Sequence, residues 1–135
     1  MKSRINILFS AAIMAMLLII ACSDTKEKII GVWVVEDVKF DTDTSRISPE
    51  QIQNAIQMQK SYHYEIFEDK TMNIVSGSGT FPGKWSLDVE KNEIFVRLDG
   101  SELNDSIRIG KFEDGRIINR DKTEAGWVEV IYEKE

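Results

Sequence analysis

Apolar and polar residues alternate in short stretches along most of the chain, which is the pattern of half-buried β-strands. The stretches end at turn signals such as Lys91-Asn92, Asp99-Gly100 and Asp114-Gly115. An Asp-Gly pair between apolar stretches is a strong hairpin signal because it tolerates positive φ angles. The pattern predicts eight strands, over residues 29–40, 62–68, 71–76, 80–87, 93–98, 101–109, 116–120 and 127–133.

The connections between these strands are mostly too short for the crossovers that parallel strands need, so the pairing is expected to be antiparallel. An open sheet of eight strands would leave exposed edges, and closure into a barrel removes them. We therefore expect an all-β fold, an eight-stranded antiparallel up-and-down barrel that is either closed or partly open. A barrel of this size either encloses one small ligand or fills itself with side chains.

One segment departs from the strand pattern. Ser48-Pro49-Glu50-Gln51 is typical of a helix start, with Ser48 as the N-cap, proline at the first helical position and Gln51 completing a capping box. Ile52, Ala55 and Ile56 then follow helical spacing. The sequence predicts a short amphipathic helix over residues 49–60, between the first and second strands.

The first strand carries apolar residues on both of its faces. Trp33 and Val35 lie on one face of a regular strand, whereas Val34 and Val38 lie on the other. Both sets can point into a barrel only if a β-bulge switches the alternation. The sequence leaves open which face points inward.

A different pattern precedes the strands. Lys2 and Arg4 lead into an uncharged stretch of 17 residues, 5–21, and then Cys22, the single cysteine. This order is typical of a signal peptide. Ile19-Ile20-Ala21-Cys22 resembles the lipobox of bacterial lipoproteins, which implies cleavage before Cys22 and lipidation of that residue. The alternative is an uncleaved anchor helix, for which the stretch is short.

The lipobox divides the chain into a signal peptide at 1–21, a lipidated cysteine with a polar spacer at 22–28, and a barrel domain at 29–135. Ser23 resembles the residue that favours outer-membrane sorting, and the acidic residues after it resemble a surface-export signal. The resemblance implies a protein anchored by lipid in the cell envelope, in the outer membrane, on its periplasmic or surface side.

The net charge of the chain limits the kinds of molecule that it is expected to bind. The chain has 17 Lys and Arg against 23 Asp and Glu, a formal charge of −6, and loss of Lys2 and Arg4 with the signal peptide makes it −8. Such an acidic chain is a poor partner for nucleic acid. A function in nucleic-acid binding is therefore set aside.

Gly31-Val32-Trp33 resembles the Gly-x-Trp signature of lipocalins, whose tryptophan closes the barrel base. Gly83-Lys84-Trp85-Ser86-Leu87 and the closing segment 127–134 extend the likeness to lipocalin-like domains of small bacterial lipoproteins, over residues 29–134. A helix after the first strand departs from ordinary lipocalins and is similar in position to the lid of fatty-acid-binding proteins. The resemblance implies a barrel that binds a small hydrophobic or amphipathic ligand.

Candidate ligand-binding residues are the aromatic residues of the expected strands and two strand arginines, similar in type to those that hold fatty-acid carboxylates in related barrels. They are Trp33, Tyr62, Tyr64, Phe81, Trp85, Arg97, Arg108 and Trp127. Phe81 and Trp85 share strand parity and hence a face. The alternative is that the rings only fill the core and that the arginines are exposed.

No constellation of catalytic or metal-ligating residues emerges. His63 is the only histidine, and it has no second histidine or free cysteine as a partner. Ser76-Gly77-Ser78-Gly79 matches neither a nucleophile elbow nor a phosphate loop and is typical of a turn. We expect no metal, no cofactor and no enzyme activity. Two functions stay open: a ligand-binding anchored barrel, or a filled barrel that acts through protein–protein contacts as a lipoprotein subunit or accessory factor.

Overall fold

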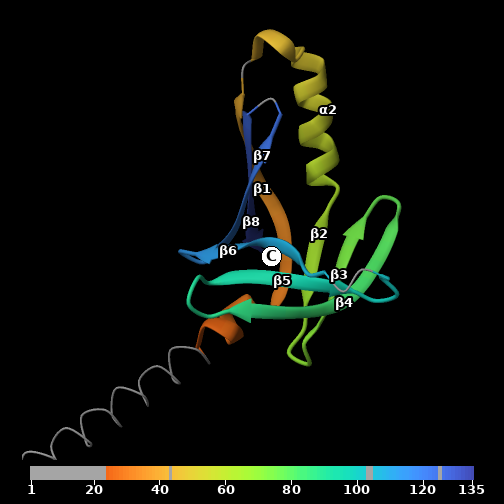
Figure 1. Ribbon diagram of the computed structural model, residues 1–135, viewed down its shortest axis with the longest axis vertical. Helices are drawn as coiled ribbons and strands as arrows, with labels where there is room; N and C mark the ends of the chain where they lie inside the picture. The colour runs from red at the N-terminus through yellow and green to blue at the C-terminus, as the bar shows by residue number, and fades with distance from the viewer. Residues whose placement is uncertain (1–23, 43, 103–104, 125) are drawn as a thin grey trace, which may run out of the picture.

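The computed structural model describes residues 24–42, 44–102, 105–124 and 126–135. Eight antiparallel strands follow one another around a closed barrel, with the first strand paired to the last (Figure 1). The expected eight-stranded all-β barrel is confirmed, and the signal peptide and Cys22 lie outside the described residues. The strands are β1 Gly31–Thr42, β2 His63–Ile66, β3 Thr71–Ser76, β4 Gly79–Asp88, β5 Glu93–Leu98, β6 Ile107–Glu113, β7 Arg116–Thr123 and β8 Gly126–Lys134.

Strand β6 differs most from the sequence pattern, which places it at residues 101–109. Gly110 ends the expected strand, yet the observed strand continues through it. A Cβ atom on Gly110 would lie 2.8 Å from the carbonyl oxygen of Ile118 on β7. The glycine therefore allows two strands to approach closely and does not mark a turn.

Helix α2 (Pro49–Lys60) lies between β1 and β2 as expected, after the short 3-10 helix η1 (Thr44–Arg46). The Gln51 N–H donates to Ser48 Oγ at 3.2 Å, and the Ser48 N–H donates to Gln51 Oε1 at 2.9 Å, so the capping box is formed. No residue of α2 is fully buried, and Ile56 packs against the edge of the core. The helix lies beside the upper part of β1 and is not part of the barrel interior (Figure 1).

A bulge in β1 resolves the question of its inward face. The pairing of β1 with β8 shifts register between Val35 and Asp37. Trp33 is buried below the shift and Val38 is buried above it. Trp33 therefore points inward below the shift and Val38 above it, whereas Val34, next to Trp33 in the strand, faces outward.

The lower half of the barrel is filled with side chains. Residues 24–29 are helical, and Ile29 is completely buried at the base of the barrel. The Trp33 indole N–H donates to the Ile29 carbonyl oxygen at 2.7 Å. The expected polar spacer at 22–28 is thus helical from residue 24 and leads directly into the core. The largest fully buried side chains are Trp33, Ile29, Ile66, Met72, Ile94, Ile109, Ile117 and Val96.

Three strands extend above this filled half, as Figure 1 shows. β2 pairs with β1 only through residues 31–34, and β6 pairs with β7 only through residues 111–113. Residues 35–42 of β1 and 119–123 of β7, with the part of β8 between them, therefore form a three-stranded arm beside α2. This arm, which lacks strand neighbours on both sides, positions the candidate site.

Candidate functional site

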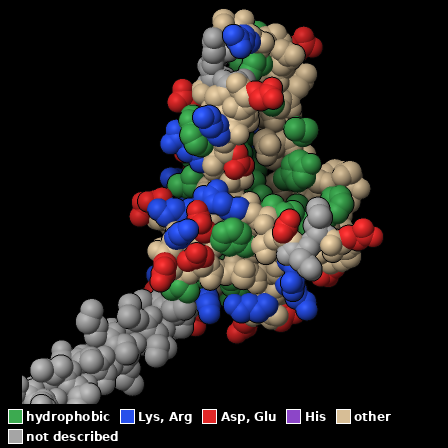
Figure 2. Space-filling view, viewed as in Figure 1, with side chains coloured by type: hydrophobic (Ala, Val, Ile, Leu, Met, Phe, Trp, Pro, Cys, Tyr) green, Lys and Arg blue, Asp and Glu red, His purple; other side chains and the backbone are tan. Residues whose placement is uncertain are grey.

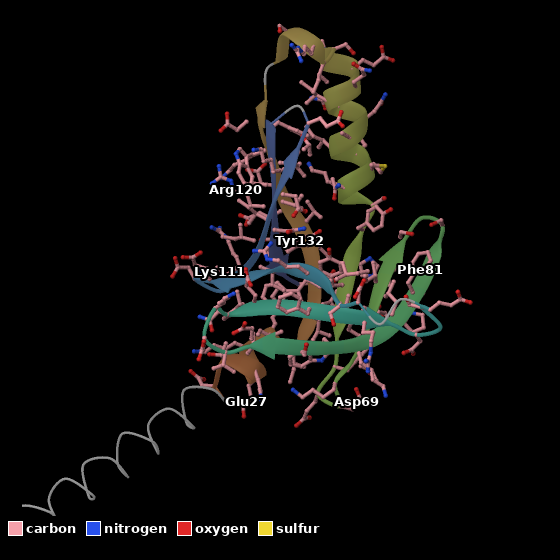
Figure 3. The ribbon with its side chains drawn as sticks, in the orientation of Figure 1. Glu27, Asp69, Phe81, Lys111, Arg120 and Tyr132 are labelled. Atoms are coloured by element: carbon pink, nitrogen blue, oxygen red, sulfur yellow. The ribbon has the colours of Figure 1, made fainter. Side chains whose placement is uncertain are left out.

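Two buried tyrosines meet where the arm joins the filled half of the barrel. Tyr132 on β8 and Tyr64 on β2 lie with hydroxyl oxygens 3.0 Å apart and ring centroids 4.7 Å apart. Figure 3 places Tyr132 at the centre of the molecule. One hydroxyl donates to the other, so the pair keeps a second hydroxyl hydrogen that this bond does not use. A buried hydroxyl with a spare hydrogen favours a further acceptor.

Burial raises the pKa of both tyrosine hydroxyls, and the carboxylate of Asp121 adds to the shift on each. In Tyr132 the neighbouring Tyr64 raises the pKa further, whereas in Tyr64 the hydrogen bond to Tyr132 opposes the shift. Both hydroxyls are therefore protonated at neutral pH. They act as hydrogen-bond donors and acceptors and carry no charge.

Asn119 and Asp121 on β7 are on the same face of the arm as the tyrosine pair, with Asn119 half-buried and Asp121 exposed. They lie directly opposite Val130 and Val128 on β8, and residues opposite one another share a face of the sheet. Asn119 Nδ2 donates to Asp121 Oδ2 at 3.2 Å. The electrostatic effect of Asp121 on both tyrosines agrees with this placement.

A chain of polar contacts bridges the gap where β6 and β7 are no longer paired. Arg108 on β6 contacts Glu93 on β5, with 3.0 Å between Nε and Oε1, and donates from Nη1 to Asn119 Oδ1 at 3.1 Å. The chain runs from Glu93 through Arg108 and Asn119 to Asp121. The positive charge of Arg108 is therefore balanced locally by the carboxylate of Glu93.

We name the upper site by its residues: the tyrosine pair, Tyr62, Asn119, Asp121 and an apolar lining from the arm, α2 and β3. The lining is less buried than the lower core, since Phe40 and Val128 are only half-buried. Figure 2 shows apolar side chains at the surface beside the lower end of α2. A few polar groups in an apolar lining are typical of a small-molecule site. The lining residues are Val35, Val38, Phe40, Ile56, Ile74, Val128 and Val130.

The structure brings two of the eight candidate residues from the sequence to this site. Tyr64 belongs to the hydroxyl pair, and Tyr62 is near enough to affect the Tyr64 pKa. Arg108 is linked to the site through Asn119. Trp33 and Trp85 are buried in the lower core instead, where the Trp85 indole N–H donates to the Phe67 carbonyl oxygen at 2.8 Å.

The other three candidates lie outside the barrel interior. Phe81 shares the face of Trp85, but it is 45 % exposed because the β3–β4 hairpin projects beyond the barrel at the margin of the molecule (Figure 3). Arg97 is exposed on β5. Trp127 is 39 % exposed on the outer face of the arm, with the Arg120 guanidinium 5.0 Å from its ring centroid.

Trp127 borders a shallow groove of about 190 Å³ on that outer face. Residues of strands β1, β7 and β8 line the groove. Two of them form an ion pair, with 3.8 Å between Lys39 Nζ and Glu129 Oε1. The groove is open to solvent, and apart from Phe40 its lining residues are on the opposite face of the arm from Val130. It is a second surface on which a partner could be held.

His63 also faces outward, since its neighbour Tyr64 faces the interior. Its Nε2 lies 3.7 Å from Glu65 Oε1, and Glu65 accepts a hydrogen bond from Asn73 at 2.8 Å. Within the described ranges, no three His, Cys, Asp or Glu side chains come together as metal ligands. The described helices also include none with the length and apolar character needed to cross a bilayer.

Sequence reasoning missed Tyr132, Asn119 and Asp121 as site residues. Tyr132 had one signal, its position in the expected closing strand. Asn119 and Asp121 had none, because Arg116 to Thr123 shows no alternation from which an inward face could be chosen. Their role follows only from the register of β7 with β8.

The sequence matches no protein-family model and no curated protein. Among solved structures, the fold is similar to the crystal structure of a DUF4847 family protein from Bacteroides vulgatus ATCC 8482. The TM-score is 0.52, with 12 % sequence identity over 81 % of this chain and 96 % of that chain. At this identity the likeness bears on the fold alone, and it supports the barrel.

Proposed function

We propose that this protein is a lipid-anchored lipoprotein of the cell envelope whose lipocalin-like barrel binds a small amphipathic molecule at the upper site. One observation carries the ligand-binding part: a buried pair of neutral tyrosine hydroxyls faces Asp121 within an apolar lining. Buried polar groups in such a lining are costly unless they have partners. The anchoring part depends on the lipobox at Cys22.

The charges at the site favour an uncharged or cationic polar group on the ligand. Asp121 presents a carboxylate, and the tyrosine hydroxyls are neutral. Arg108 is paired with Glu93, and Arg97 is on the outer surface, so neither arginine offers an unbalanced cation to a fatty-acid carboxylate. An alcohol or amine head group suits this site better, with its apolar body against Phe40 and Val128.

Helix α2 would control access to the bound molecule. It lies beside the arm, contributes Ile56 to the lining, and contains no fully buried residue. A cover with few buried contacts opens at low free-energy cost. We propose binding and no catalysis, because Asp121 and the tyrosines form a recognition surface without a paired general base and nucleophile.

Binding can be tested with two probes of equal chain length, a fluorescent fatty amine and a fluorescent fatty acid. The chain from residue 24 onward contains the whole described core and is suited to this assay. We expect the amine to bind at least about tenfold more tightly, because a second carboxylate beside Asp121 is repelled. Asp121→Asn should reduce that preference to near unity.

Glu90→Gln is the matched control, since it removes one exposed carboxylate from the β4–β5 turn, away from the upper site. It should leave the preference unchanged. Failure of both probes to bind, together with ligand-free native mass spectra of protein purified from cells, would count against the proposal.

A second function is favoured by the outer groove, where Trp127 and Arg120 form an exposed aromatic and cationic pair. Tryptophan and arginine are enriched at the centres of protein interfaces. In this function the barrel is a filled lipoprotein subunit that contacts another protein. Trp127→Ala should then abolish co-purification of the partner while leaving probe binding intact.

A further inference from the structure

The lower end of the barrel combines an exposed aromatic side chain with three exposed cations. Phe67 is 43 % exposed, and the exposed side chains of Lys70, Lys84 and Arg97 lie on the neighbouring strands and turn. We call these four residues the lower face. Figure 2 shows Lys and Arg side chains gathered at this edge, although the chain as a whole is acidic.

The sheet places two cations of the lower face close together. Lys84 on β4 is directly opposite Arg97 on β5, whereas Lys70 is in the β2–β3 turn at the end of the barrel, with its ammonium over the Trp85 ring. Like charges in opposite positions destabilise a sheet. Among the described residues, none forms an ion pair with these three side chains. An external anion between Lys84 and Arg97 would remove their repulsion.

Aromatic and hydrogen-bonded contacts hold this region in place. The Lys70 ammonium lies 4.2 Å from the Trp85 ring centroid, and the Trp85 indole N–H fixes the Phe67 carbonyl. Asp69 in the same turn is occupied internally, since it accepts hydrogen bonds from the Thr71 N–H and hydroxyl, which lower its pKa. The cations therefore keep their charge available for an outside group.

A groove of about 250 Å³ adjoins the lower face and is walled by the helical segment 24–29 and the β2–β3 turn. It carries Lys26 and Lys70 together with Glu27 and Glu68, and Trp85 forms its apolar floor. This mixture suits a group that has both a phosphate and an ammonium. Figure 3 shows Glu27 and Asp69 at the same end of the molecule.

The place where the described chain begins bears on what covers the lower face. Residue 24 begins this end of the domain, and Cys22 is two residues before it. We propose that the lower face lies against the membrane, with Phe67 in the headgroup region and Lys70, Lys84 and Arg97 on phospholipid phosphates. Aromatic and cationic side chains favour this interface. The inference rests on the proposed lipid anchor at Cys22.

The test uses the full chain isolated from membranes and reconstituted in vesicles of phosphatidylethanolamine and phosphatidylglycerol. Hydrogen exchange of the turn amides 68–70 should be at least about fivefold slower at 50 mM than at 1 M salt, because salt screens the contact. The combined change Lys70→Gln, Lys84→Gln, Arg97→Gln should abolish the difference. The control Lys60→Gln, Lys91→Gln, Lys122→Gln removes the same charge from exposed positions elsewhere and should retain it.

Mass spectrometry of the isolated chain separates the two proposals. An acylated chain whose turn amides exchange equally at both salt concentrations overturns the membrane-facing orientation and leaves the anchor intact. A chain without acyl groups overturns the anchor and, with it, the orientation. Equal loss of protection in the two triple variants assigns the effect to net charge and also overturns the proposed contact.

Discussion

Tyr64 and Tyr132 place two hydroxyl groups where the surrounding side chains are apolar. Burial favours the neutral form of both hydroxyls and raises the pKa of each, whereas their mutual hydrogen bond raises the pKa of Tyr132 and lowers that of Tyr64. A residue pair of this kind links the stability of the fold to pH. It also gives the upper site its only pair of buried hydroxyls among the described residues.

Alkaline pH should destabilise the protein through this pair. Because the folded-state pKa of each hydroxyl lies above the unfolded value of 10.0, its contribution is fully present below about pH 10 and is lost as pH rises above that value. Tyr132→Phe should lose about 1 kcal/mol at pH 7, since Tyr64 loses its partner. Between pH 9 and pH 11 the free energy of unfolding of Tyr132→Phe should fall by less than that of the wild type.

Urea unfolding at pH 7, pH 9 and pH 11, followed by tryptophan fluorescence, measures the free energy of unfolding of each protein. Tyr62→Phe is the comparison, because the Tyr62 hydroxyl is outside the bonded pair. Parallel pH profiles for the wild type and Tyr132→Phe would show that the pair does not control alkaline stability.

At the scale of elements, local signals in the sequence located the turns and the helix. Asp114 and Gly115 both have positive φ, at 50° and 76°, as the Asp-Gly hairpin signal requires. The capping box at Ser48 predicted the observed start of α2, and the helical spacing that begins at Ile52 predicted its extent to Lys60. β6 was misplaced because Gly110 resembles a strand end unless the neighbouring strand is known.

The upper site was predictable only in part, because its residues are brought together by the pairing of strands that are distant in the sequence. Tyr62 and Tyr64 stand out as aromatic residues, whereas Asn119 and Asp121 are ordinary polar residues until β7 is aligned with β8. The bulge at Val35 to Asp37 also changes which residues of β1 face the site. Register and bulges depend on contacts between distant segments, and a local pattern does not specify them.

Removing the helix cap should loosen α2 without unfolding the barrel. Ser48→Ala eliminates the hydrogen bond from the Gln51 N–H, and loss of such a cap costs about 1 kcal/mol. Amides of α2 should therefore exchange about fivefold faster, while buried strand amides such as Ile94 keep their rates. Ser106→Ala, in the exposed β5–β6 connection, is the control. Uniform acceleration of all amides would show that α2 and the barrel open together.

At the scale of the whole molecule, three regions have separate tasks in the proposed function. The filled lower half supplies stability, the upper site supplies recognition, and the segment before residue 24 supplies attachment. The two halves differ because the β1 bulge redirects the strand above Val35. The lower half can therefore be tightly packed without limiting the upper site.

Attachment depends on one atom, the sulfur of Cys22, under this proposal. Cys22→Ala should leave uncleaved precursor and remove all incorporation of a radiolabelled lipid precursor, because the lipidated thiol is absent. Ser23→Ala keeps the thiol and should remain labelled. Persistent labelling of Cys22→Ala would show that the lipobox assignment is wrong.

The burial of Ile29 sets a limit on how far an anchored barrel can move. Six helical residues span about 9 Å, and the two residues from Cys22 to Asp24 add at most about 7 Å. A lipid on Cys22 would thus hold the barrel within about 16 Å of the bilayer surface. On so short a tether the barrel would not travel between membranes, and the proposed ligand would have to reach it by diffusion or from the same membrane.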